Sequence, residues 1–197
     1  MEKHMNLPIF WRILPLSFFA LFSQYALAHP NHETGLLSGF IHPFLGLDHI
    51  LAMLAVGLWA GRLGKQARVQ IPSMFVFVMA FACVLAVLGM KVPYVEQGIA
   101  LSVVFLGLLL LFSLRFSTVA SATLIAFFAF FHGAAHGIEM PANVYTSLYI
   151  VGFAAASVLL HLCGILVSHL LFRTENPLFH RITGFTIFCA GISLSLV

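Results

Sequence analysis

The sequence predicts an all-α, polytopic membrane protein: a bundle of six transmembrane helices that follows a cleavable signal peptide. Hydrophobic residues make up 61% of the 197 residues, and charged residues make up only 8%, against about 25% in an ordinary soluble domain. The hydrophobic residues also fall in continuous runs of about 20, the length of a membrane span. Such a chain cannot cover a core with polar surface, so a soluble globular fold is excluded. A net charge of +3 without a basic cluster excludes nucleic-acid binding.

Residues 1–28 have the features of a secretory signal peptide. A weakly basic start precedes a short apolar run, and small residues at Ala26 and Ala28 form a signal-peptidase site of the A-x-A type. Cleavage would leave 29–197 as the transmembrane domain, with His29 at its N-terminus outside the cytoplasm. The alternative is an uncleaved first helix, although the apolar run is short for a span of about 20 residues.

Six apolar runs of the mature chain are long enough to span a membrane as helices. They cover residues 40–60, 71–90, 96–114, 118–138, 147–171 and 179–197. Only a helix satisfies its own backbone hydrogen bonds in lipid over such a continuous run. The sequence therefore predicts six helices joined by short hydrophilic loops.

Charges in the loops predict the orientation of these helices. With the mature N-terminus outside, the loops that face the cytoplasm carry six basic residues and the outer segments carry one. The six are Arg62, Lys65, Arg68, Arg115, Arg173 and Arg181, and the one is Lys91. This distribution obeys the positive-inside rule. We therefore expect a multi-pass protein of a bacterial cytoplasmic (inner) membrane, with both ends of the mature chain outside the cytoplasm.

The first predicted span contains the motif HPFLGLDH, which begins at His42. Ionisable residues are costly inside a bilayer, so each one in a span is a candidate functional residue. Pro43 favours the first turn of a helix, which would put His42 at the outer mouth of the span. Asp48 and His49 would then lie one to two turns deeper, and His42 and His49 would share a face of a regular helix.

The fourth predicted span ends in FHGAAHGIE, where His132, His136 and Glu139 are spaced by four and three residues. This spacing places two imidazoles and a carboxylate on one helix face. Imidazole and carboxylate are ligands that Ni²⁺, Co²⁺ and Zn²⁺ accept. Gly133 and Gly137, like a glycine pair in the first span, would let another helix approach closely and add ligands of its own.

The two motifs face the same side of the membrane, because one begins its span and the other ends a span of opposite direction. Glu96, at the start of the third span, lies on that side, as do the N-terminal His29, His32 and Glu33. The sequence therefore predicts one extracytoplasmic vestibule lined by ionisable residues.

Structural roles are the alternative for each of these histidines. One alternative is that the five ionisable groups of the two motifs form a purely structural polar network. The protein would then keep five costly groups at one depth of the membrane without a functional role. His161, midway along the fifth span, fits either an interhelical hydrogen bond or a deeper ligand role. His169 and His180 fall near the cytoplasmic end and fit interfacial positions.

The motifs HPxxGxDH and FHGxAHGxE resemble those of the HupE/UreJ family of nickel/cobalt permeases, and the resemblance covers essentially the whole mature chain. It implies uptake of Ni²⁺ or Co²⁺ for hydrogenase, urease or cobalamin systems. It also implies a transporter rather than an enzyme, whose metal, with Zn²⁺ as an alternative, is cargo and not a catalytic cofactor. The metal-interacting positions it implies are His29, His42, Asp48, His49, Glu96, His132, His136 and Glu139. Secondary candidates are His161, whose surroundings resemble the family's fifth-span LHxxG, and His32 and Glu33, which lie on the outer side.

Two other function classes would use the same residues. A membrane-embedded zinc-dependent hydrolase would activate water at the His/Asp/Glu cluster, although the chain has no HExxH motif. A haem or quinone protein would use histidines from facing helices as axial ligands. The chain also has no ATP-binding motif, so transport would be passive, driven by the membrane potential, or coupled to another process.

Overall fold

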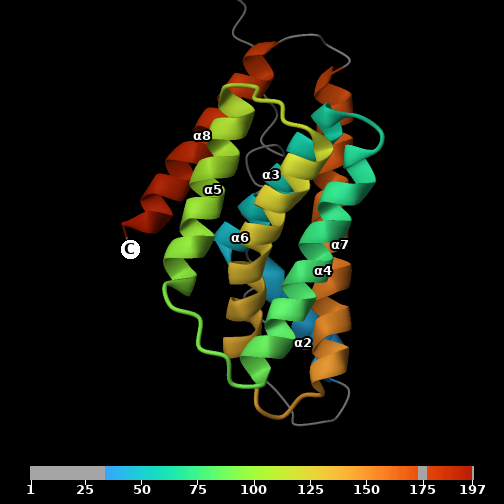
Figure 1. Ribbon diagram of the computed structural model, residues 1–197, viewed down its shortest axis with the longest axis vertical. Helices are drawn as coiled ribbons and strands as arrows, with labels where there is room; N and C mark the ends of the chain where they lie inside the picture. Colours follow the sequence, from blue (N-terminus) through green and yellow to red (C-terminus); the bar gives the residue numbers. More distant parts are fainter. Residues whose placement is uncertain (1–33, 173–176, 197) are drawn as a thin grey trace, which may run out of the picture. The chain divides into compact units, whose positions relative to one another are not determined.

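The computed structural model describes residues 34–172 and 177–196, and all regular structure in these ranges is helical. The elements are α2 (Thr34–Ile41), the 3₁₀ helix η1 (His42–Phe44), α3 (Leu47–Leu63), α4 (Ala67–Val87), α5 (Val95–Leu111), α6 (Thr118–Ile138), α7 (Thr146–Phe172) and α8 (Pro177–Ser195). The long helices lie side by side (Figure 1). The predicted all-α fold is confirmed for these residues. The predicted signal peptide, residues 1–28, lies outside them.

Three helices are long and apolar enough to cross a membrane: α4, α6 and the Thr146–Leu170 part of α7. Residues 35–63 add a fourth candidate if the bent pair that they form is one span. The apolar helices Val95–Leu111 and Arg181–Ser195 are shorter. Several apolar helices of this kind indicate a multi-pass membrane protein, whereas the predicted number of six spans stays a prediction.

The first predicted span is not a continuous helix from residue 40, and this part of the prediction was wrong. The chain bends by 80° between the segments Gly35–Phe44 and Leu47–Leu63. Pro43 has no N–H to donate, and Gly46 adopts an extended conformation (φ −98°, ψ 122°) directly before α3. His42 therefore belongs to a separate short element, and His49 lies in the first turn of α3.

Glycines allow two helix pairs to approach backbone to backbone. α3 packs against α7, where a Cβ on Gly57 would overlap the carbonyl oxygen of His161. α6 packs against α4, where a Cβ on Gly133 would overlap the carbonyl oxygen of Met79. Both glycine pairs singled out in the sequence therefore lie at tight helix contacts. These contacts fix α3 and α6, which carry the two motifs, against their neighbours.

The two ends of the helix bundle carry opposite charges. The end where α6 ends and α3, α5 and α7 begin is called the Glu139 end here, and its described carboxylates are Asp48, Glu96 and Glu139. The end where α3 ends and α4 begins is called the Arg68 end. Its described basic residues are Arg62, Lys65, Arg68, Arg115 and Arg181. Lys91, in the loop before α5, lies at the Glu139 end.

Replacing Gly133 with leucine tests the α4–α6 contact. The new side chain would collide with the carbonyl of Met79, and overpacking of this kind costs about 1–3 kcal/mol. We expect the unfolding temperature of the detergent-solubilised protein, followed by tryptophan fluorescence, to fall by several degrees. Thr123→Leu is the control, because Thr123 is an exposed residue of the same helix. Equal unfolding temperatures for the two variants would contradict the close contact.

Candidate metal centre

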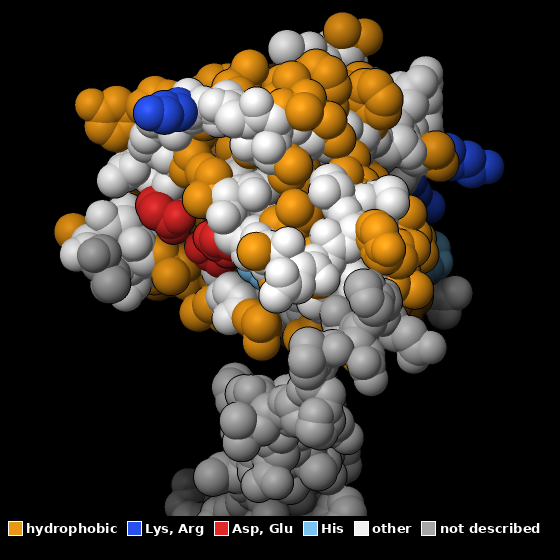
Figure 2. Space-filling view, turned by 90° about the horizontal axis from the view of Figure 1, so that it is seen from below, with side chains coloured by type: hydrophobic (Ala, Val, Ile, Leu, Met, Phe, Trp, Pro, Cys, Tyr) orange, Lys and Arg blue, Asp and Glu red, His pale blue; other side chains and the backbone are white. Residues whose placement is uncertain are grey.

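A pocket of about 310 Å³ opens at the Glu139 end. Its lining residues come from three segments of the chain: His42, Leu45, Gly46, Asp48, His49, Glu96 and Glu139. Seen from this end, acidic side chains gather beside a histidine within a largely hydrophobic face (Figure 2). The pocket thus combines three carboxylates with two imidazoles, which is a donor set for a divalent transition-metal ion.

Three histidines from three elements form a cluster at the floor of this pocket. His42 of η1, His49 of α3 and His136 of α6 each offer one ring nitrogen, and these nitrogens lie within 4.8 Å of one another. The ring centre of His136 is 4.8 Å from that of His42 and 4.9 Å from that of His49. Nitrogens bound to one ion at about 2.1 Å are at most about 4.2 Å apart, so a side-chain shift of less than about 1 Å would let the three share an ion.

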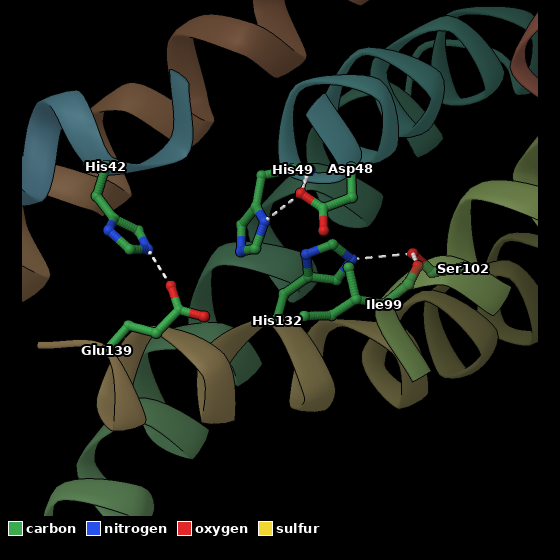
Figure 3. A network of polar contacts seen from close by, with 7 residues as sticks. All are labelled: His42, Asp48, His49, Ile99, Ser102, His132 and Glu139. Carbon is green, nitrogen blue, oxygen red and sulfur yellow. Dashed lines mark hydrogen bonds and ion pairs between the residues drawn. The ribbon is translucent and has the colours of Figure 1, made fainter. Parts of the chain in front are cut away.

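Glu139 closes the cluster on the side of the pocket. It follows the last residue of α6, and its Oε2 lies 3.1 Å from Nε2 of His42 (Figure 3). Both side chains are partly exposed. This contact ties the 3₁₀ helix before α3 to the end of α6, so the mouth of the pocket is held together by a pair that a cation could separate.

Asp48 orients the imidazole of His49. One carboxylate oxygen, Oδ1, accepts a hydrogen bond from the backbone N–H of His49 at 2.7 Å and lies 2.9 Å from its ring Nδ1. A carboxylate only accepts, so Nδ1 carries the proton of the neutral ring and Nε2 keeps its lone pair. Nε2 is buried and has no hydrogen-bond partner among the described residues. Histidines that bind a metal through one ring nitrogen usually donate the other ring N–H to a carboxylate or a similar acceptor.

Ser102 of α5 plays the same part for His132 of α6. The Ser102 hydroxyl donates its single proton to the carbonyl oxygen of Ile99 at 2.6 Å. At the 2.9 Å contact with His132 it must therefore accept, from Nε2–H of the ring (Figure 3). This fixes the tautomer of neutral His132 and leaves a lone pair on Nδ1, which is buried without a partner within the described chain. The rings of His132 and His49 are 4.8 Å apart.

His136 is held by ring packing instead of hydrogen bonds. Its ring stacks on Phe153 of α7, with centres 4.4 Å apart and planes 9° apart. Both ring nitrogens are buried and unpaired in the part of the chain that the structure describes, as is the hydroxyl of neighbouring Tyr149. Buried polar atoms are nearly always paired in folded proteins. Unpaired nitrogens on His49, His132 and His136 at one place therefore favour a cation as their missing partner.

The structure brings together most of the residues that the sequence singled out. Five line the pocket, namely His42, Asp48, His49, Glu96 and Glu139, and the buried His132 and His136 lie against His49. His161 is buried elsewhere, against Phe75. His29, His32 and Glu33 lie outside the described residues. The role of each residue as a metal ligand stays a prediction.

Sequence reasoning missed Ser102, Tyr149 and Phe153. Ser102 had a signal, since a polar residue inside an apolar run usually has a hydrogen-bond partner on another helix. The two aromatic residues had none, because the chain contains 21 Phe and 4 Tyr and their positions relative to His136 depend on how α6 and α7 pack.

Removing the Ser102 hydroxyl tests the tautomer of His132. We expect ¹⁵N NMR of histidine side chains in detergent micelles to show the Nε2–H form of His132 in the wild type and in Ser102→Thr. In Ser102→Ala the ring loses its acceptor and should populate both tautomers. Ser121→Ala is the control, because the Ser121 hydroxyl is buried but makes no described hydrogen bond. Unchanged His132 signals in Ser102→Ala would contradict the assignment.

Comparison with known proteins agrees with this arrangement of motifs. The family model described as "HupE / UreJ protein" matches residues 17–194. The curated relative "Protein HupE" of Rhizobium leguminosarum bv. viciae is 44% identical over 172 residues, which cover 86% of this chain and 90% of that protein. No solved structure matches. The family model thus covers most of the chain, and the chain belongs to the HupE/UreJ family.

Proposed function

We propose that this protein is a membrane permease that imports Ni²⁺ or Co²⁺ through the pocket at the Glu139 end. The observation that carries the proposal is a group of buried imidazole nitrogens that have no hydrogen-bond partner among the described residues and lie beneath a pocket lined by three carboxylates. A structural histidine network would pair those nitrogens with each other or with the backbone. Membership of the HupE/UreJ family, which is generally one of nickel and cobalt transport proteins, supports the same function.

The proposed topology has six spans after a cleaved signal peptide, residues 1–28, in the inner membrane of a bacterium. The charge distribution supports it, because the described basic loop residues gather at the Arg68 end. Under the positive-inside rule that end faces the cytoplasm and the Glu139 end faces outward. The pocket would then receive ions from outside the cytoplasm, and His29, His32 and Glu33 would lie on the same side.

Capture begins with the carboxylates of the pocket. Asp48, Glu96 and Glu139 attract a hydrated dication and offset its charge as it leaves water. When the ion displaces the contact between His42 and Glu139, both groups become available as ligands. The imidazoles of His42, His49 and His136 then replace bound water molecules.

Selectivity follows from the imidazoles. Mg²⁺ and Ca²⁺ prefer oxygen ligands, and Mg²⁺ gives up its water molecules reluctantly. Borderline ions such as Ni²⁺ and Co²⁺ accept neutral imidazole readily. Buried imidazoles behind an acidic mouth would thus bind transition-metal ions, whereas Mg²⁺ and Ca²⁺ would not pass beyond the carboxylates.

Release on the cytoplasmic side requires weaker coordination. Protons compete with metal for imidazole, and movement of α3 relative to α6 would separate the ligands. The ion would then be available to nickel- or cobalt-dependent systems such as hydrogenase, urease or cobalamin synthesis, with which the family resemblance is associated.

Uptake of radioactive nickel or cobalt by cells that express variants tests the site. We expect Asp48→Asn and His132→Ala each to lower uptake at least about tenfold, because one removes the charge that orients His49 and the other removes a buried ligand. His169→Ala, at an exposed position of α7, should transport normally. Expression of each variant is measured in the same membranes. Undiminished uptake in both site variants would contradict the proposed site.

Reporter fusions test the topology. Alkaline phosphatase is active only outside the cytoplasm, so a fusion after Ala142, between α6 and α7, should be active. A fusion after Lys65, between α3 and α4, should be inactive. Fluorescent-protein fusions at the same two positions should give the opposite pattern. Reversed activities would place the pocket in the cytoplasm and contradict import through it.

A further inference from the structure

His161 of α7 is a buried imidazole that the capture site does not use. His161 is 1% exposed, and neither of its ring nitrogens has a hydrogen-bond partner in residues 34–172 or 177–196. Its ring contacts Phe75 of α4, with centres 5.1 Å apart and planes at 78°. An imidazole with both nitrogens buried and unpaired needs a partner that the surrounding chain does not provide.

Phe75 contacts both His161 and the metal centre. Its side chain is fully buried, and its ring centre lies 5.5 Å from that of His132 and 5.1 Å from that of His161. The same ring therefore touches both a histidine of the cluster and the isolated histidine. An ion that moved from His132 to His161 would pass along this ring.

Two further donors lie on the same two helices, one turn from His161 and from Phe75. Ser157, one helical turn earlier on α7, is buried, donates its hydroxyl proton to the carbonyl oxygen of Phe153 at 2.7 Å and lies 4.0 Å from the thioether sulfur of Met79 on α4. Imidazole, hydroxyl and thioether groups thus line the contact between α4 and α7. Borderline ions accept imidazole readily, whereas a thioether is a softer ligand. With no carboxylate among them, these donors would hold a dication weakly, and weak binding is what a transit site needs.

A surface groove runs from His161 toward the Arg68 end. The groove, of about 490 Å³, lies between α4 and α7, and its lining includes Pro72 and Arg68 together with exposed apolar side chains such as Phe77 and Leu162. Pro72 lies inside α4 and has no N–H, so the carbonyl oxygen of Arg68 lacks its helical hydrogen bond. This gives α4 a weak point one turn before Phe75, where it could bend and swing the ring aside.

The geometry points to His161 as a second, transient metal ligand on the import path, separated from the capture site by the ring of Phe75, which acts as the gate between them. This inference rests on the proposed function. It divides transport into capture at the pocket and passage beyond it, so the two steps have separate readouts. Equilibrium binding reports on capture, and flux reports on passage.

The experiment measures both quantities on purified protein. Ni²⁺ binding is measured by calorimetry in detergent, and uptake is measured in proteoliposomes that contain a nickel-sensitive dye. We expect His161→Ala to lower uptake at least about tenfold while the binding constant stays within about twofold of the wild type. His169→Ala is the matched control on α7 and should change neither quantity. If His161→Ala is not recovered folded, His161→Asn replaces it with the same expectation.

Substitution of Phe75 tests the gate. Leucine is smaller than phenylalanine, so Phe75→Leu should raise uptake by about threefold. Tryptophan is larger, so Phe75→Trp should lower uptake. Equilibrium Ni²⁺ binding should be unchanged in both variants. Phe128→Leu is the control, because Phe128 is a buried ring of α6 that contacts other phenylalanines instead of histidine.

Three outcomes are informative in different ways. If His161→Ala or both Phe75 variants keep uptake within about twofold of their controls, the inference is overturned. If the His161 variants lose equilibrium binding together with uptake, His161 belongs to the capture site and a second, separate binding position is excluded. If the wild type neither binds nor transports Ni²⁺ or Co²⁺, the proposed function itself fails.

Discussion

Burial of imidazole nitrogens without hydrogen-bond partners is the constraint on which the rest of this structure depends. Each buried polar group that lacks a partner costs about 1–3 kcal/mol, and His49, His132 and His136 each carry at least one such nitrogen. Asp48 and Ser102 pair the other nitrogen of the first two rings and thereby leave a lone pair facing the cluster. Among the described residues, these three histidines form the largest group of such nitrogens, and a bound cation would remove the cost of leaving them unpaired.

Close helix packing is what brings these rings together. Gly57 and Gly133 let α3 and α6 approach α7 and α4 until backbone meets backbone, which leaves no room for a side chain at either position. The break before α3 has an equally direct effect. Because the chain turns by 80° there, His42 approaches His136 from a different direction than His49 does. A straight helix would have placed His42 and His49 one above the other.

Acidic and basic side chains lie at opposite ends of the helix bundle. Carboxylates at the Glu139 end and basic residues at the Arg68 end set up a field that favours a cation at the pocket. The described buried residues between the two ends are mostly apolar, with histidines and serines as the main polar side chains. Under the proposed function, so few donors would hold an ion weakly, and the contacts of Phe75 with both His132 and His161 would suit a stepwise passage.

The helical class, the apolar runs and the two motifs could be predicted from the sequence, because hydropathy, helical periodicity and ligand chemistry act over short stretches of chain. The end at which the motifs meet also followed from the direction of their helices. Local pattern failed at Pro43 and Gly46, where backbone geometry overrode an apolar run. It marked Ser102 only as a polar residue inside an apolar run and did not identify His132, 30 residues away, as its partner. The sequence by itself thus determined the membrane setting and the candidate ligands. Only the tertiary structure decided which ring nitrogens lack a partner among the described residues and which ring contacts both His132 and His161, because both depend on contacts between helices distant in the chain.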